Sequence, residues 1–117
     1  MARTEPRLNV VFAPEALDDL ARIWIRNAER YGLEHADEYV GFLKQVIFSL
    51  DRSYGAGKAI DSRPDLRYIL VRRKPKGHGH LAVYRVSSTA VEVLHVFHTA
   101  QDWEPRLPPA EAGDSRE

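Results

Sequence analysis

The densest group of chemically capable side chains lies in the stretch VLHVFHTAQDW, residues 93–103. It carries five side chains that could do chemistry or bind a partner: His95, His98, Gln101, Asp102 and Trp103. A histidine can serve as a general base near neutral pH, and an acid beside it can orient a substrate. The stretch begins like a β-strand, so two interpretations stay open, an active site at a strand end or a well-anchored chain end.

Other candidate groups are sparser. His78 and His80 have an H-x-H spacing that would suit two metal ligands on one face of a strand. They fall in the glycine-rich run KGHGH, however, and no third ligand is evident. Gly55 and Gly57 are too isolated to form a phosphate-binding loop. We therefore expect neither a metal nor a cofactor.

Charge is unevenly distributed along a chain whose formal net charge is zero. The segment 66–91 contains no acid and six bases: Arg67, Arg72, Arg73, Lys74, Lys76 and Arg85. A one-sided basic field suits an anionic partner. The structural alternative is a solvated basic face on a neutral protein.

The bulk properties exclude several classes of protein. The 117 residues suffice for one small domain, and the absence of cysteine excludes a disulfide framework and thiol chemistry. No apolar run reaches the length of a signal peptide or a membrane span. We expect a soluble, cytoplasmic protein.

The elements that must position these side chains can be located from periodicity. Residues 8–12 form a short apolar strand, and apolar residues at three- and four-residue steps predict helices over 14–31 and 33–52. The very short link at Gly32 implies that the two helices form an antiparallel hairpin.

The second half of the chain has strand character. Residues 53–65 have the composition of a loop, and strands are expected at 67–73, 81–86 and 91–98. Short links between them predict antiparallel hairpins. The predicted fold is α+β, in the order β-α-α-β-β-β, with a helical hairpin packed on a small antiparallel sheet.

Within the last expected strand, simple alternation places His95, Phe97 and Val93 on one face. We expect one folded domain over residues 1–103. The proline-rich tail, residues 104–117, has little to bury and is expected to be mostly disordered.

The order and spacing of these pieces resemble the ParE-like branch of the ParE/RelE toxin superfamily. The residues that carry the resemblance are Ala16, Asp19-Leu20, Ile23-Trp24, Tyr31-Gly32, Ala36, Tyr39, Leu43, Leu50, Leu66-Arg67, Val83-Tyr84-Arg85-Val86, Val93 to His98, and Gln101-Asp102. The similarity covers residues 8–103. Each piece is degenerate, and the strength of the match lies in a Y-R-V strand followed by a strand ending in histidine and a polar exit.

The resemblance implies the toxin of a type II toxin–antitoxin pair, of the kind associated with plasmid stabilisation. Its partner would be a ParD-like antitoxin in a hetero-oligomer, and operator DNA would be reached only through that antitoxin. ParE-like members act on DNA gyrase, whereas RelE-like members cut mRNA on the ribosome. A third interpretation is an inactive member of the family kept as a regulatory partner.

The residues favour the non-enzymatic branch. RelE-like nucleases with a catalytic histidine carry an arginine at the start of the preceding strand, and here Leu81 holds that position. Arg85 lies four residues on, displaced by roughly 13 Å along a strand. If the protein is a nuclease, His98 would act with Arg85 and with Arg67 or Arg73.

Two binding surfaces are expected. The antitoxin would cover apolar residues that a small domain leaves exposed, and would pair its acids with nearby bases: Trp24, Ile25, Tyr39, Phe42, Val46, Arg67, Arg72 and Arg73. The cellular target would meet the end of the last strand through His98, Gln101, Asp102 and Trp103. The structural alternative for Trp103 is packing over the sheet edge.

Overall fold

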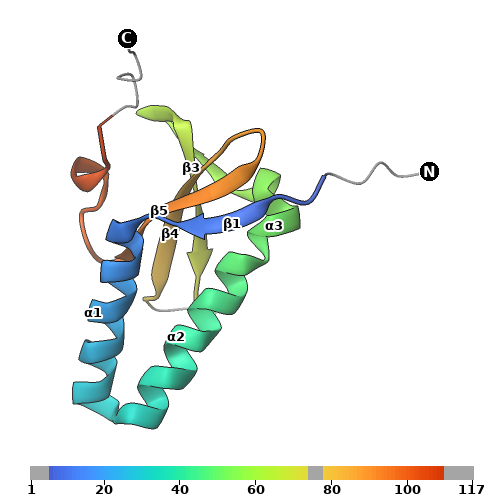
Figure 1. Cartoon of the computed structure of the whole chain (residues 1–117). Helices are drawn as coiled ribbons and strands as arrows, with labels where there is room; N and C mark the ends of the chain where they lie inside the picture. Colours follow the sequence, from blue (N-terminus) through green and yellow to red (C-terminus); the bar gives the residue numbers. More distant parts are fainter. Residues whose placement is uncertain (1–5, 74–77, 110–117) are drawn as a thin grey trace.

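The computed structural model describes residues 6–73 and 78–109. A strand, a helical hairpin and four further strands follow one another along the chain (Figure 1). Their bounds are β1 (Asn9–Phe12), α1 (Pro14–Tyr31), α2 (Leu33–Phe48), α3 (Leu50–Ser53), β2 (Lys58–Ile60), β3 (Arg63–Val71), β4 (His80–Val86) and β5 (Ala90–His98), with single 3-10 turns at Tyr54–Ala56 and Glu104–Arg106. The α+β class and the strand-helix-helix-strand order are confirmed.

The helical hairpin follows from local sequence chemistry. Pro14 occupies the first turn of α1, where its missing N–H costs nothing. Gly32 ends α1 and begins α2 with φ of 99° and ψ of 166°, a conformation that is essentially restricted to glycine. Its N–H donates to the carbonyl of Ala28 and closes the helix end. One residue therefore reverses the chain and makes the two helices antiparallel neighbours.

The second helix is shorter than expected. The prediction of one helix over 33–52 is wrong after Phe48, where the chain turns at Ser49 and resumes as α3. The Ser49 hydroxyl donates to the carbonyl of Val46 at 2.6 Å, and such back-bonding bends helices.

The sheet has five strands in the order β1-β5-β4-β3-β2. It is mixed, because β1 pairs with β5 in parallel while the other pairs are antiparallel, so the expectation of a purely antiparallel sheet is corrected. The prediction of a loop over 53–65 missed β2, a three-residue strand too short to show alternation.

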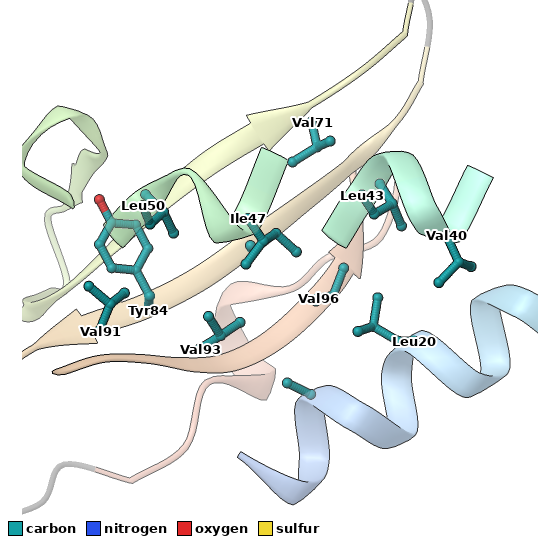
Figure 2. Packing of buried hydrophobic residues seen from close by; sticks show 12 residues of the cluster. Leu20, Val40, Leu43, Ile47, Leu50, Val71, Tyr84, Val91, Val93 and Val96 are labelled. Carbon is teal, nitrogen blue, oxygen red and sulfur yellow. The ribbon is translucent and has the colours of Figure 1, made fainter. Parts of the chain in front are cut away.

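Most of the core lies between the helices and the sheet. Figure 2 shows Leu43 and Ile47 of α2 pointing toward the strands. They pack with Tyr84 and Val93 in a cluster that we call the helix-side core. Burying each large aliphatic side chain contributes roughly 1.5–3 kcal/mol, so this layer supplies most of the hydrophobic stabilisation.

A second cluster covers the far face of the sheet, and we call it the far-side core. Its buried members include Leu66, Leu81, Val83, Leu94 and Phe97, with Tyr68, Trp103 and Leu107 packed against them. Residues 104–109, which composition placed in the tail, thus begin with a 3-10 turn and contact the sheet through Leu107. The rest of the predicted disordered tail, residues 110–117, lies outside the described residues.

A β-bulge changes the facing of β5. Val83 pairs with His95 and Tyr84 pairs with Val93, so Leu94 is an extra residue in the strand. The prediction that Val93 shares a face with Phe97 is therefore wrong. Val93 belongs to the helix-side core and Phe97 to the far-side core.

Candidate functional site

A cleft of about 610 Å³ lies between α1 and the neighbouring ends of β4 and β5. The side chains that line it include four histidines and four arginines: His78, His80, His95, His98, Arg22, Arg26, Arg30 and Arg106. Asp19 is the one acid in its lining. The cleft is therefore strongly cationic although the whole chain has no formal net charge.

Three histidine rings stand close together at the mouth of β4 and β5. His80 and His98 are direct cross-strand partners, with ring centroids 5.2 Å apart, and His78 lies 5.6 Å from His98. The Tyr39 hydroxyl of α2 lies 2.6 Å from Nδ1 of His80. The backbone N–H of Ala100 donates to Nδ1 of His98, which leaves Nε2 of that ring to carry the proton in its neutral form.

The environment favours the neutral form of the His80 and His98 imidazoles. Burial lowers the pKa of His80 to about 4, and the nearby charges of His98 and Arg26 act in the same direction. Burial also lowers the pKa of His98, assisted by His78 and Arg26. Burial raises the pKa of the Tyr39 hydroxyl. At pH 7 the rings of His80 and His98 are therefore uncharged and can accept or donate one hydrogen bond each.

Asp19 has a structural role at the edge of the cleft. One carboxylate oxygen accepts the backbone N–H of Val96 at 2.9 Å and lies 2.8 Å from Nδ1 of His95. The other lies 3.5 Å from Arg22. The backbone contact forms where β5 has run past the end of β1, so Asp19 provides the partner that a neighbouring strand would otherwise supply.

The arginines of α1 form a row. Arg22, Arg26 and Arg30 recur every four residues, which separates successive residues by about 6 Å along the helix axis and keeps them on one face. In residues 6–73 and 78–109, no acidic side chain forms an ion pair with Arg26, Arg30 or Arg106. This row can hold an anion.

The structure does not bring together the residues predicted for a nuclease. His98 lies at the His80 end of β4, whereas Arg85 lies at the opposite end, where it pairs with Glu92 at 2.7 Å. Arg67 donates to the carbonyl of Gly57 at 2.8 Å and holds a loop. Leu81, in the position of the nuclease arginine, is buried in the far-side core.

The predicted antitoxin-binding residues fall in two places. Trp24 and Ile25 line a groove of about 700 Å³ between α1 and α2, with Ile25 51% exposed. The half-buried side chains Tyr39, Phe42 and Val46 lie on the opposite side of α2, as its 100° rotation per residue requires.

Three arginines were grouped with these apolar residues, and all three are exposed. Arg73 lies over the rings of Tyr39 and Phe42, at 6.0 and 5.1 Å from the ring centroids. It therefore joins the side of α2 that faces away from the groove. Arg67 and Arg72 lie on β3 and directly after it.

The predicted target-binding residues also divide. His98 and Gln101 line the cleft, and the Gln101 side chain accepts the backbone N–H of His98 at 3.1 Å. Asp102 is exposed. Trp103 packs on the far-side core, with ring centroids 5.3 Å from Tyr68 and 6.2 Å from Phe97.

The sequence interpretation missed the arginine row and the structural role of Asp19. Arg22, Arg26 and Arg30 lie outside the segment 66–91, to which the basic charge was assigned from the sequence. The four-residue spacing of three arginines was the available signal.

Two features are absent from the described part of the chain. No three histidine, aspartate or glutamate side chains come together there in a way that could hold a metal ion. Within those same residues, none of the helices has the length and apolar character needed to span a membrane.

Comparisons with known proteins point to one family. The family model described as ParE toxin of type II toxin-antitoxin system, parDE, matches residues 10–103. A solved structure titled as the chromosomal ParDE TA system from P. aeruginosa is similar in fold, with a TM-score of 0.67 and 20% identity, over 80% of this chain and 97% of that one. No curated protein sequence matches the chain significantly.

Proposed function

Because the chain belongs to the ParE toxin family and is the toxin component of a type II toxin–antitoxin system, we propose that it acts by inhibiting DNA gyrase. The observation that carries the proposal is the family match over residues 10–103, which covers both long helices and every strand except the first residue of β1, Asn9. The protein would act by binding, with a ParD-like antitoxin as its neutralising partner.

The placement of the basic side chains supports a mechanism without catalysis of its own. A ribonuclease needs a base, an acid and a cation around one scissile phosphate. Arg85 and His98 stand at opposite ends of the β4–β5 pair, and Arg85 is already engaged by Glu92. One substrate phosphate could not contact both side chains.

The test is a supercoiling assay with purified gyrase and the toxin at micromolar concentration. We expect inhibition of supercoiling or accumulation of cleaved DNA, and relief of both when the antitoxin is added. Normal supercoiling at that concentration would reject gyrase as the target.

A parallel assay separates this mechanism from mRNA cleavage. An Arg85→Ala variant should remain toxic on expression, because Arg85 pairs with Glu92 at the end of the β4–β5 pair that lies away from His98. Loss of toxicity in the folded Arg85→Ala variant, together with mRNA cleavage by the unaltered protein on translating ribosomes, would establish a nuclease instead.

For the antitoxin we propose the groove between α1 and α2 as the main contact. Ile25 is half-exposed there, and Gly41 leaves the α2 wall open, since no atom lies within 4 Å of the Cβ position. Burying apolar surface contributes about 25 cal/mol per Å². An antitoxin segment that covers a few hundred Å² in the groove therefore gains more than rim ion pairs supply, since each pair contributes up to about 1 kcal/mol. The affinity should therefore depend more on this groove than on Arg72 or Arg73.

The groove can be tested with a matched pair of variants. Ile25→Lys should weaken antitoxin binding, whereas Leu17→Lys changes an equally exposed residue of α1 outside the groove. Titrations of the toxin with the antitoxin at several salt concentrations measure the electrostatic contribution to the binding affinity. A steep loss of affinity at moderate salt, with Ile25→Lys neutral, would show that the basic residues dominate.

A further inference from the structure

The function proposed above assigns no role to the arginines of the cationic cleft between α1 and β5. Its arginine row repeats about every 6 Å along the axis of α1, and a bound anion would stabilise these neighbouring like charges. The single acid of the lining, Asp19, is already occupied by the Val96 N–H and the His95 ring. Arg26 and Arg30 have no acidic partner among the described residues.

The wall opposite the arginines is made of rings. His98 stands between His78 and His80, and Tyr39 continues the row from His80 at a centroid distance of 5.5 Å. Planar rings of this kind offer stacking faces and single hydrogen bonds to a flat heterocycle. An anion without a ring, such as an acidic peptide, would contact the arginines but would not stack on this row of rings.

The size of the cleft fits a small ligand. Its volume of about 610 Å³ falls within the roughly 300–1,000 Å³ of sites that hold small molecules and cofactors. Arginine is also the side chain best suited to bind phosphate through two parallel hydrogen bonds.

We propose that this cleft binds a nucleotide, with its phosphates on Arg26 and Arg30 and its base against the ring wall of His78 and His98. The same chemistry is presented by a free nucleoside triphosphate and by a nucleotide within single-stranded nucleic acid. The inference does not depend on the gyrase target, because it concerns the toxin alone.

Binding to the purified toxin can be measured with two fluorescent probes, a labelled ATP and a labelled hexanucleotide of uridine. We expect saturable binding of at least one probe. Arg26→Gln and Arg30→Gln should each weaken it by roughly tenfold, as expected for loss of a charge-assisted hydrogen bond. Arg52→Gln, an exposed arginine of α3 outside the cleft, is the matched control and should bind normally.

The ring wall is tested separately. His78→Ala, a change of an exposed side chain, should weaken labelled ATP but leave tripolyphosphate competition unchanged. Binding of ATP alone would identify a free nucleotide as the source, and binding of the hexanucleotide alone would identify a strand.

Three outcomes would overturn the proposal. The first is that neither probe binds at millimolar concentration. The second is that the Arg26→Gln and Arg30→Gln variants bind as tightly as the unaltered protein. The third is that a polyglutamate peptide displaces the probe as readily as unlabelled nucleotide does. None of them depends on the gyrase assay, so failure here and failure of the proposed function can be told apart.

Discussion

At the scale of single residues, Tyr84 joins the sheet to the turn that precedes β2. Its side chain is fully buried, yet its hydroxyl accepts the Gly57 N–H at 3.1 Å and donates to the Tyr54 carbonyl at 2.7 Å. Gly57 has to be glycine here, because a Cβ would lie 2.1 Å from the hydroxyl oxygen. Gly57, which is too isolated in the sequence to form a phosphate-binding loop, is thus needed so that the Tyr84 hydroxyl can approach the backbone closely.

Tyr84→Phe removes that hydroxyl and both of its hydrogen bonds, one from the Gly57 N–H and one to the Tyr54 carbonyl. We expect the free energy of unfolding to fall by about 1–3 kcal/mol, the net contribution of two hydrogen bonds. Urea denaturation measures it. Tyr68→Phe is the control, since the structure gives that half-buried tyrosine a ring contact to Trp103, and it should change stability by less than about 0.5 kcal/mol. Equal effects of the two variants would contradict this role of Tyr84.

His80 should make the fold sensitive to acid. Its pKa is about 4 in the folded protein and 6.5 ordinarily, so between these values the unfolded chain binds a proton that the folded chain does not. Stability is therefore complete above pH 6.5 and falls as the pH decreases toward 4, by at most about 3 kcal/mol.

The measurement is the free energy of unfolding from pH 7.5 to 4 for the protein and for His80→Gln. Carboxylates titrate in both proteins, so the difference in slope isolates the histidine. Parallel pH profiles would show that His80 is protonated in the folded state.

At the scale of elements, Gly32 determines the helical hairpin. Its φ of 99° with extended ψ is strained for any residue with a Cβ, even though no atom lies within 4 Å of the Cβ position. Gly32→Ala should cost about 1–3 kcal/mol. Gly41→Ala, inside α2 and equally unobstructed, should instead stabilise the protein by about 0.5–1 kcal/mol.

Thermal unfolding of the two variants distinguishes an effect of backbone conformation from an effect of steric room for the added methyl group. Both positions have room for a methyl group, so opposite signs are expected from backbone conformation alone. A neutral Gly32→Ala would mean that the hairpin readily adopts a different turn.

The elements whose ends are determined by nearby residues could be predicted, and those that depend on a distant strand could not. Pro14 and Gly32 mark the ends of α1 by chemistry that acts locally, and that helix was located correctly. The bulge at Leu94 and the strand β2 leave no periodic trace, because each depends on what a distant strand offers as a partner. Neither could be predicted from the sequence alone.

The same reasoning applies to the cleft. His98 was identified because it ends a strong strand pattern, whereas its neighbours His80 and Arg26 come from other elements. Their proximity depends on β4–β5 register and on the docking of α1. The sequence thus predicted the residues at the end of β5, but it did not predict the positive charge of the cleft around them.

At the scale of the whole molecule, the sheet is covered on both faces. The helical hairpin covers one, and the segment from Trp103 to Leu107 covers part of the other. Arg63 donates to the carbonyl of Pro108, and Ser62 donates to Glu104 at 3.2 Å, so this segment is tied to the start of β3.

Trp103→Ala should therefore destabilise the protein. We expect a loss of about 2–3 kcal/mol, below the roughly 3–5 kcal/mol typical of large buried aromatics, because Trp103 is only partly buried. Leu70→Ala, at a more exposed position on β3, should cost less than about 1 kcal/mol. A stable Trp103→Ala variant that had lost gyrase inhibition would instead assign Trp103 to target contact.

The parallel pairing of β1 with β5 sets the timing of folding during synthesis. Asn9 to Phe12 pair with Ala90 to Val93, so the first strand stays without its neighbour until most of the chain has been translated. At about 5–20 residues per second, that wait lasts roughly 4–16 seconds. A ribosome that has not passed β5 carries no finished toxin, and an antitoxin made meanwhile can be present before the sheet closes.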